Sequence, residues 1–61
     1  MNKHQRNEIA KLAVMHKLGM HDAVARGLSA LIRSAITARA RAALLKYAEL
    51  FAVTNNPDFI V

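Results

Sequence analysis

The fold of this chain depends on residues 23–53, AVARGLSALIRSAITARARAALLKYAELFAV. This stretch contains no proline and one glycine, Gly27, and it is dominated by Ala, Leu, Arg and Lys, which are strong helix formers. Helix propensity alone therefore predicts one continuous helix. The apolar residues, however, do not form a single stripe along such a helix.

Two apolar stripes follow one another along this stretch. The apolar residues of its first half share one helical face: Val24, Leu28, Leu31, Ile32 and Ala35. Those of its second half share a different face: Ile36, Ala40, Ala43, Leu44, Tyr47, Leu50 and Phe51. The two faces differ by roughly a quarter turn, which is more than helix periodicity produces over this distance. The change of face implies either a bend in the helix or a second partner for it.

We expect residues 22–53 to form one long helix whose second stripe packs on another copy of the chain. The alternative is a bend near Ile36–Arg39, which would give three short helices around one core. Sharp kinks usually require glycine or proline, and neither lies there, so the continuous helix is preferred. Burying each large side chain of the second stripe is worth about 1.5–3 kcal/mol, which favours a homo-oligomer, most simply a dimer.

A first helix is predicted over residues 3–18. Asn2 and Gln5 have the spacing of a capping pair at its start. Gly19 stands where helices commonly end in a left-handed residue. Asp22 then offers a side-chain oxygen to cap the next helix, and Arg26, four residues further on, is placed to pair with it.

Residues 54–61 are predicted to form an extended tail. Pro57 prevents the helix from continuing, and Asn55 or Asn56 suits the left-handed position after a helix. The apolar residues at 59–61 should fold back on a helix or dock elsewhere, because an exposed apolar patch is unfavourable. The predicted fold is an all-α helical hairpin in one domain, residues 1–61: helix 3–18, turn 19–21, long helix 22–53 and tail 54–61.

The charge of the chain favours acidic partners. Nine Lys and Arg residues against four Asp and Glu residues give a net charge of +5, and all nine basic residues lie within residues 1–46. Arginine occupies every basic position from 26 to 41, and arginine suits bidentate pairing with carboxylates. We therefore predict that an acidic protein surface is bound by these arginines, by the apolar tail, or by both: Arg26, Arg33, Arg39, Arg41, Phe59, Ile60 and Val61.

Residues suited to catalysis or metal binding are sparse. The chain has no cysteine, which excludes disulfides and thiolate chemistry. His4, His16 and His21 lack the spacing by which one helix brings two imidazoles to one ion. The four carboxylates are dispersed, and Ser29 and Ser34 lie inside a predicted helix, a poor setting for a nucleophile. We expect no enzyme activity, no metal and no cofactor.

DNA binding by a helix-turn-helix is the alternative function. Helix, glycine turn and helix follow one another over residues 11–30, with apolar or small residues at several positions of that motif. The residues placed to contact DNA would be His21, Arg26, Ser29 and Arg33. An ordinary helical hairpin has the same turn and spacing, and the motif generally needs a third helix for support, so this interpretation is the second choice.

The predicted function is that of a small non-enzymatic adaptor or inhibitor. Short length and basic charge without catalytic features are typical of small accessory proteins, including those of phages and mobile elements. A cytoplasmic location is expected, since no uncharged apolar stretch approaches the roughly 18 residues of a membrane span and no signal-peptide core follows the basic start. Adsorption to a membrane surface is a third alternative, disfavoured because residues 1–46 contain no aromatic anchor.

Overall fold

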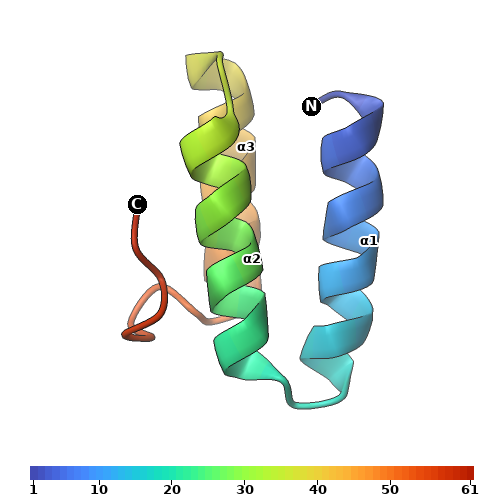
Figure 1. Ribbon diagram of the computed structural model, residues 1–61, viewed down its shortest axis with the longest axis vertical. Helices are drawn as coiled ribbons and strands as arrows, with labels where there is room; N and C mark the ends of the chain where they lie inside the picture. The colour runs from blue at the N-terminus through green and yellow to red at the C-terminus, as the bar shows by residue number, and fades with distance from the viewer.

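The computed structural model describes residues 1–61, and every regular element in it is a helix (Figure 1). Helix α1 spans Lys3–Lys17, α2 spans His21–Ser34 and α3 spans Ala38–Leu50. The prediction of an all-α fold is confirmed. The prediction of a hairpin with one long helix over residues 22–53 is wrong, because the chain breaks after Ser34 and forms three helices around one core.

Helix α1 begins and ends as its sequence indicates. Asn2 Oδ1 accepts a hydrogen bond from the Gln5 backbone N–H at 2.8 Å, and Gln5 Oε1 accepts one from the Asn2 N–H at 2.9 Å, which is a capping box. After the helix, Gly19 has a φ of 78°, and the Met20 N–H donates to the Met15 carbonyl at 3.0 Å. This Schellman motif ends α1, and α2 then runs antiparallel to it.

The start of α2 differs from the prediction. Met20 holds the N-cap position and makes no side-chain cap, while Asp22 lies within the first turn. A carboxylate there interacts favourably with the helix dipole. The Asp22–Arg26 pair is not formed either, since Asp22 Oδ1 accepts from Asn56 Nδ2 at 2.8 Å and Arg26 pairs with Asp58. Asp22 and Arg26 therefore both hold the tail.

The break between α2 and α3 occurs without glycine or proline. Ala35 and Thr37 have extended backbone, with ψ values of 129° and 149°, and Thr37 Oγ1 accepts the Ala40 N–H at 3.1 Å as the N-cap of α3. The Ala35 carbonyl accepts from Arg41 Nε at 3.1 Å. These contacts satisfy backbone groups that a continuous helix would have bonded internally, so the chain can turn at little cost.

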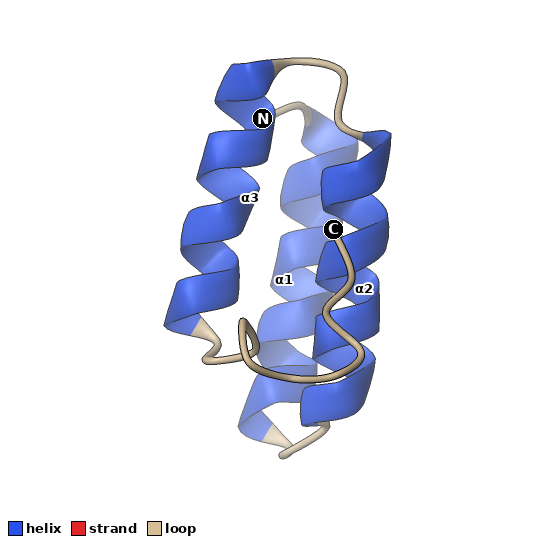
Figure 2. Ribbon diagram, turned by 90° about the vertical axis from the view of Figure 1, so that its left-hand side faces the viewer, coloured by secondary structure: helices blue, strands red, loops and turns tan.

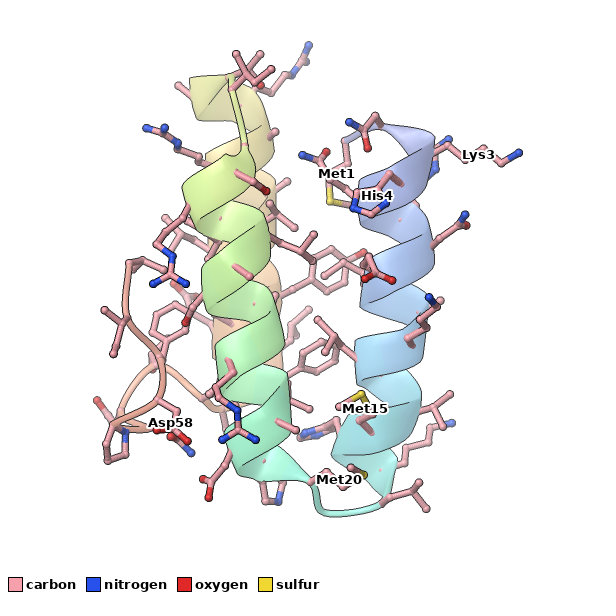
Figure 3. All side chains as sticks on the ribbon, in the orientation of Figure 1. Met1, Lys3, His4, Met15, Met20 and Asp58 are labelled. Carbon is pink, nitrogen blue, oxygen red and sulfur yellow. The ribbon has the colours of Figure 1, made fainter.

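Helix α2 lies at the centre of the packing. Both α1 and α3 pack on it, whereas no Cα atom of α1 lies within 8 Å of a Cα atom of α3. Side chains fill the space between α1 and the other two helices (Figure 3). The buried apolar side chains form one cluster: Ile9, Leu12, Val24, Ala25, Leu28, Leu31, Ile32, Ala35, Ala40, Leu44, Ala48 and Val53. Burial of the larger ones, at about 1.5–3 kcal/mol each, drives α3 back onto α2.

The packing of α3 on α2 divides the apolar stripe that was predicted to form an oligomer interface. Five of its residues are buried or half-buried within the chain itself: Ala40, Ala43, Leu44, Tyr47 and Phe51. The other two remain outside, with Ile36 95% and Leu50 72% exposed. The apolar surface that motivated a homo-oligomer is therefore mostly covered by the chain's own helices.

Helix α3 ends in a second Schellman motif, this time without glycine. Ala52 has a φ of 57°, and the Val53 N–H donates to the Ala48 carbonyl at 3.1 Å. Ala52, and neither of the two asparagines that follow, thus occupies the left-handed position. This conformation costs an L-residue about 1–2 kcal/mol. Val53 is fully buried, and the chain then crosses to α2 (Figure 2).

Ala52→Gly is expected to raise the free energy of unfolding by about 0.5–1 kcal/mol, because glycine adopts a positive φ without steric cost. Urea unfolding followed by circular dichroism would measure the change. Ala42→Gly, at an exposed position inside α3, is the matched control and should lower the free energy of unfolding by about 1 kcal/mol. A similar loss in both variants would contradict strain at Ala52.

Candidate partner-binding surface

The tail, residues 54–61, folds back along the face of α2 that points away from α1 (Figures 1 and 2). Four α2 residues contact it through side-chain atoms: Asp22, Arg26, Ser29 and Arg33. Their spacing of three or four residues places them on one side of the helix. The sequence predicted an extended tail whose apolar residues either fold back on a helix or dock elsewhere. The structure shows that the tail folds back on α2 of its own chain.

Ser29 is the centre of this contact. Its side chain is 2% exposed, and its Oγ donates to the Ala25 carbonyl at 2.7 Å and accepts from the Ile60 N–H at 2.8 Å. On either side, Arg26 Nη1 lies 2.8 Å from Asp58 Oδ2, and Arg33 Nη1 donates to the Ile60 carbonyl at 3.4 Å. A row of polar groups on α2 therefore holds an acidic and apolar segment.

The tail is shaped by its own turn before it reaches α2. Asn56 Oδ1 accepts the Asp58 N–H at 2.8 Å, and the Asn56 carbonyl accepts the Phe59 N–H at 2.9 Å. Such an Asx turn directs the chain without helix or strand. It places Asp58 beside α2 (Figure 3) and lets Phe59 pack against the core. Phe59 thus anchors the tail, whereas Ile60 and Val61 are 63% and 60% exposed.

The four predicted arginines have different surroundings. Arg26 is paired with Asp58, while Arg41 is held by its bond to the Ala35 carbonyl. Arg39 is exposed and has no polar side-chain partner in the structure. No carboxylate lies within 4 Å of the guanidinium groups of Arg33, Arg39 or Arg41. These three positive charges are available to another molecule.

A groove of about 390 Å³ lies between α2, α3 and the end of the tail. Five residues line it: Ile32 and Arg33 of α2, Arg41 and Leu45 of α3, and Val61. The fold therefore brings together three residues of the predicted partner-binding set: Arg33, Arg41 and Val61. Ile32 and Leu45 were not among the predicted site residues, because the position of a groove depends on how α3 packs on α2.

Three of the four residues of the DNA-binding alternative, Arg26, Ser29 and Arg33, lie on the face of α2 that the tail covers, whereas His21 contacts His16 of α1. His21 is exposed at the start of the helix, but the tail covers Ser29, and Asp58 pairs with Arg26. With the tail in this position, duplex DNA would meet a carboxylate at Arg26 and could not reach the Ser29 hydroxyl. No observation favours DNA readout by this surface over protein binding.

Two histidines meet across the first turn. The rings of His16 and His21 lie edge to face with centroids 5.4 Å apart, and His16 also lies against Phe51 at 5.1 Å. His16 Nδ1 is buried without a hydrogen-bond partner. The five-residue separation of the two histidines did not suggest this contact, which the turn after α1 produces. No group of three metal-ligating side chains is gathered in the structure.

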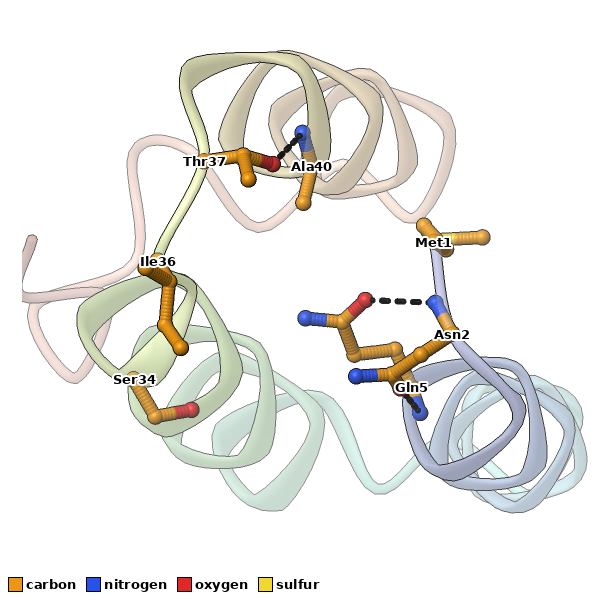
Figure 4. Close-up of a pocket in the computed structure, with 7 residues that line it drawn as sticks. All are labelled: Met1, Asn2, Gln5, Ser34, Ile36, Thr37 and Ala40. Atoms are coloured by element: carbon orange, nitrogen blue, oxygen red, sulfur yellow. Dashed lines mark hydrogen bonds between the residues drawn. The ribbon is translucent and has the colours of Figure 1, made fainter.

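A second cavity, of about 410 Å³, lies where α1 begins and α2 turns into α3 (Figure 4). Its lining residues are Met1, Asn2, Gln5, Ser34, Ile36, Thr37 and Ala40. Polar side chains of this cavity already take part in the caps of α1 and α3, through the hydrogen bonds drawn in Figure 4. The fourth polar residue, Ser34, donates its hydroxyl to the Leu31 carbonyl at 3.0 Å, so each polar side chain of the cavity already serves a local hydrogen bond.

Comparisons of the chain with protein-family models, with curated proteins and with solved structures found no match. None of the three helices combines the length and the apolar character that crossing a bilayer requires. The surface formed by α2, α3 and the tail is therefore the candidate binding surface of this chain.

The hydroxyl of Ser29 should matter more to stability than the Arg26–Asp58 ion pair. Ser29→Ala is expected to lower the free energy of unfolding by about 1 kcal/mol, because the Ile60 N–H loses its partner. Asp58→Asn should change it by less than about 0.5 kcal/mol, since the ion pair lies at the surface, with the Arg26 side chain 62% and the Asp58 side chain 39% exposed. Urea unfolding of both variants would test this order, and a larger effect of Asp58→Asn would contradict it.

Proposed function

We propose that this protein is a small non-enzymatic adaptor or inhibitor that binds an acidic protein surface. The contact would be made by the arginines of α2 and α3 together with the exposed end of the tail. One observation carries the proposal: Arg33, Arg41 and Val61, which belong to three different segments, line the same groove, and neither arginine is neutralised by a carboxylate.

Three further features support this function. Arginine binds carboxylates through two parallel N–H groups and is enriched at protein interfaces. The bond of 3.1 Å from Arg41 Nε to the Ala35 carbonyl restricts the Arg41 side chain, which reduces the entropy lost on binding. Ile60 and Val61 supply apolar surface next to these charges, a combination that suits protein recognition better than readout of phosphates alone.

Capture of partner proteins should depend on the groove arginines. The variant Arg33→Ala/Arg41→Ala is expected to lose the proteins that the unmodified chain retains from a cell extract, as measured by affinity purification and mass spectrometry. Lys3→Ala/Lys17→Ala removes the same charge from exposed positions of α1 and should retain them. Identical capture by all three proteins would refute a role for these arginines.

We also propose self-association, now through fewer exposed apolar residues than the sequence suggested. Ile36 and Leu50 are the two residues of the predicted interface that remain exposed. Stable interfaces bury on the order of 1,000 Å² or more, far more than two side chains offer. The association is therefore expected to be weak.

Sedimentation velocity at increasing concentration would measure this association. The sedimentation coefficient should rise only at high micromolar concentration, and Ile36→Ser/Leu50→Ser should abolish the rise. Val14→Ser/Leu18→Ser, which alters two other exposed apolar residues, is the control and should behave as the unmodified protein. A single species at every concentration would refute the oligomer.

A further inference from the structure

We propose that the groove between α2 and α3 binds a peptide segment in which an acidic residue adjoins an aliphatic one, supplied by a partner protein. This inference rests on the proposed function and specifies the chemistry of the partner. Three observations support it. The groove is lined by apolar side chains, its two arginines have no carboxylate partner, and the chain's own tail binds beside it through an acidic residue followed by apolar ones.

The groove has an apolar floor and a basic rim. Ile32 is 5% exposed and belongs to the core, while Leu45 and Val61 are 39% and 60% exposed. A volume of about 390 Å³ is sufficient for one or two aliphatic side chains. An occupant must therefore place apolar groups between α2 and α3, which a purely polar ligand would not do.

The two arginines require the opposite charge next to those apolar groups. Arg33 and Arg41 each use an N–H group on a backbone carbonyl, and a guanidinium has five such groups, so several remain for a carboxylate. The groove thus complements an occupant that is both aliphatic and negatively charged.

The tail shows how α2 binds such a segment. Asp58 places its carboxylate on Arg26, Phe59 packs against the core, and the Ile60 backbone bonds to Ser29. An acidic residue followed by apolar ones is thereby held by an arginine and a neighbouring apolar site. One to two turns further along α2, Arg33 lies next to the apolar side chain of Ile32. Helix α3 adds a second arginine and a second apolar side chain to this groove, Arg41 and Leu45.

The test uses the unmodified 61-residue chain and a fluorescein-labelled 12-residue peptide composed of Asp, Leu and Gly, with Asp-Leu-Leu-Asp at its centre. Fluorescence anisotropy should show saturable binding. Arg33→Ala/Arg41→Ala should weaken binding at least tenfold, or about 1.4 kcal/mol, and Lys3→Ala/Lys17→Ala should change it by less than twofold. The same peptide with Lys in place of Asp should not bind.

Amide chemical shifts of the unmodified protein supply a readout that does not depend on any variant. Addition of the Asp–Leu peptide should shift the amides of Ile32, Arg33, Arg41 and Leu45 most. No binding at millimolar peptide, shifts confined to other helices, or displacement of the peptide by duplex DNA with greater affinity would each overturn the inference. Circular dichroism would establish that the double arginine variant is folded.

The peptide proposal and the proposed adaptor function can fail independently of each other. If Arg33→Ala/Arg41→Ala loses its captured proteins but the unmodified protein does not bind the peptide, the adaptor function stands and the acidic–aliphatic ligand is refuted. If the arginine variant captures the same proteins as the unmodified chain and also binds the peptide equally well, both proposals fail.

Discussion

Burial of α2 on several sides at once is the interaction on which the rest of the structure depends. Its apolar face receives α1 and α3, and its polar face receives the tail. Neither α1 nor α3 approaches the other as closely as each approaches α2. A 61-residue chain buries a modest fraction of its surface, so one central helix shared by three segments makes efficient use of few apolar residues.

The break after Ser34 follows from this constraint. A straight helix over residues 22–53 would satisfy local propensity, which is worth only tenths of a kcal/mol per residue. It would leave Leu44, Ala48 and Val53 in water, whereas they are fully buried in the three-helix fold. Thr37 and Arg41 bond to the backbone at the break, and the long-range burial outweighs the few helical bonds that are lost.

The same turn creates the candidate binding surface. Arg33 and Arg41 lie on different helices and meet only because α3 folds back on α2. The tail then adds Val61 to that groove and covers Ser29 on the neighbouring face. A short polar network thus separates the α2 face into a part occupied by the chain itself and a part that remains open. Arg26 and Arg33 share this face and both bond to the tail, but only Arg26 is paired with a carboxylate.

The sequence by itself determined the helical class, the capping box at Asn2 and Gln5 and the left-handed cap at Gly19, because these depend on residues a few positions apart. The rotated second stripe also pointed to either a bend or a second partner, but a local pattern does not state whether a stripe packs on its own chain or on a copy. Tertiary structure decided that α3 covers α2, that Ala52 takes a left-handed conformation and that the tail reaches Arg26 and Ser29. These outcomes depend on contacts between residues distant in the sequence, whose combined burial energy exceeds the local preferences that a sequence displays.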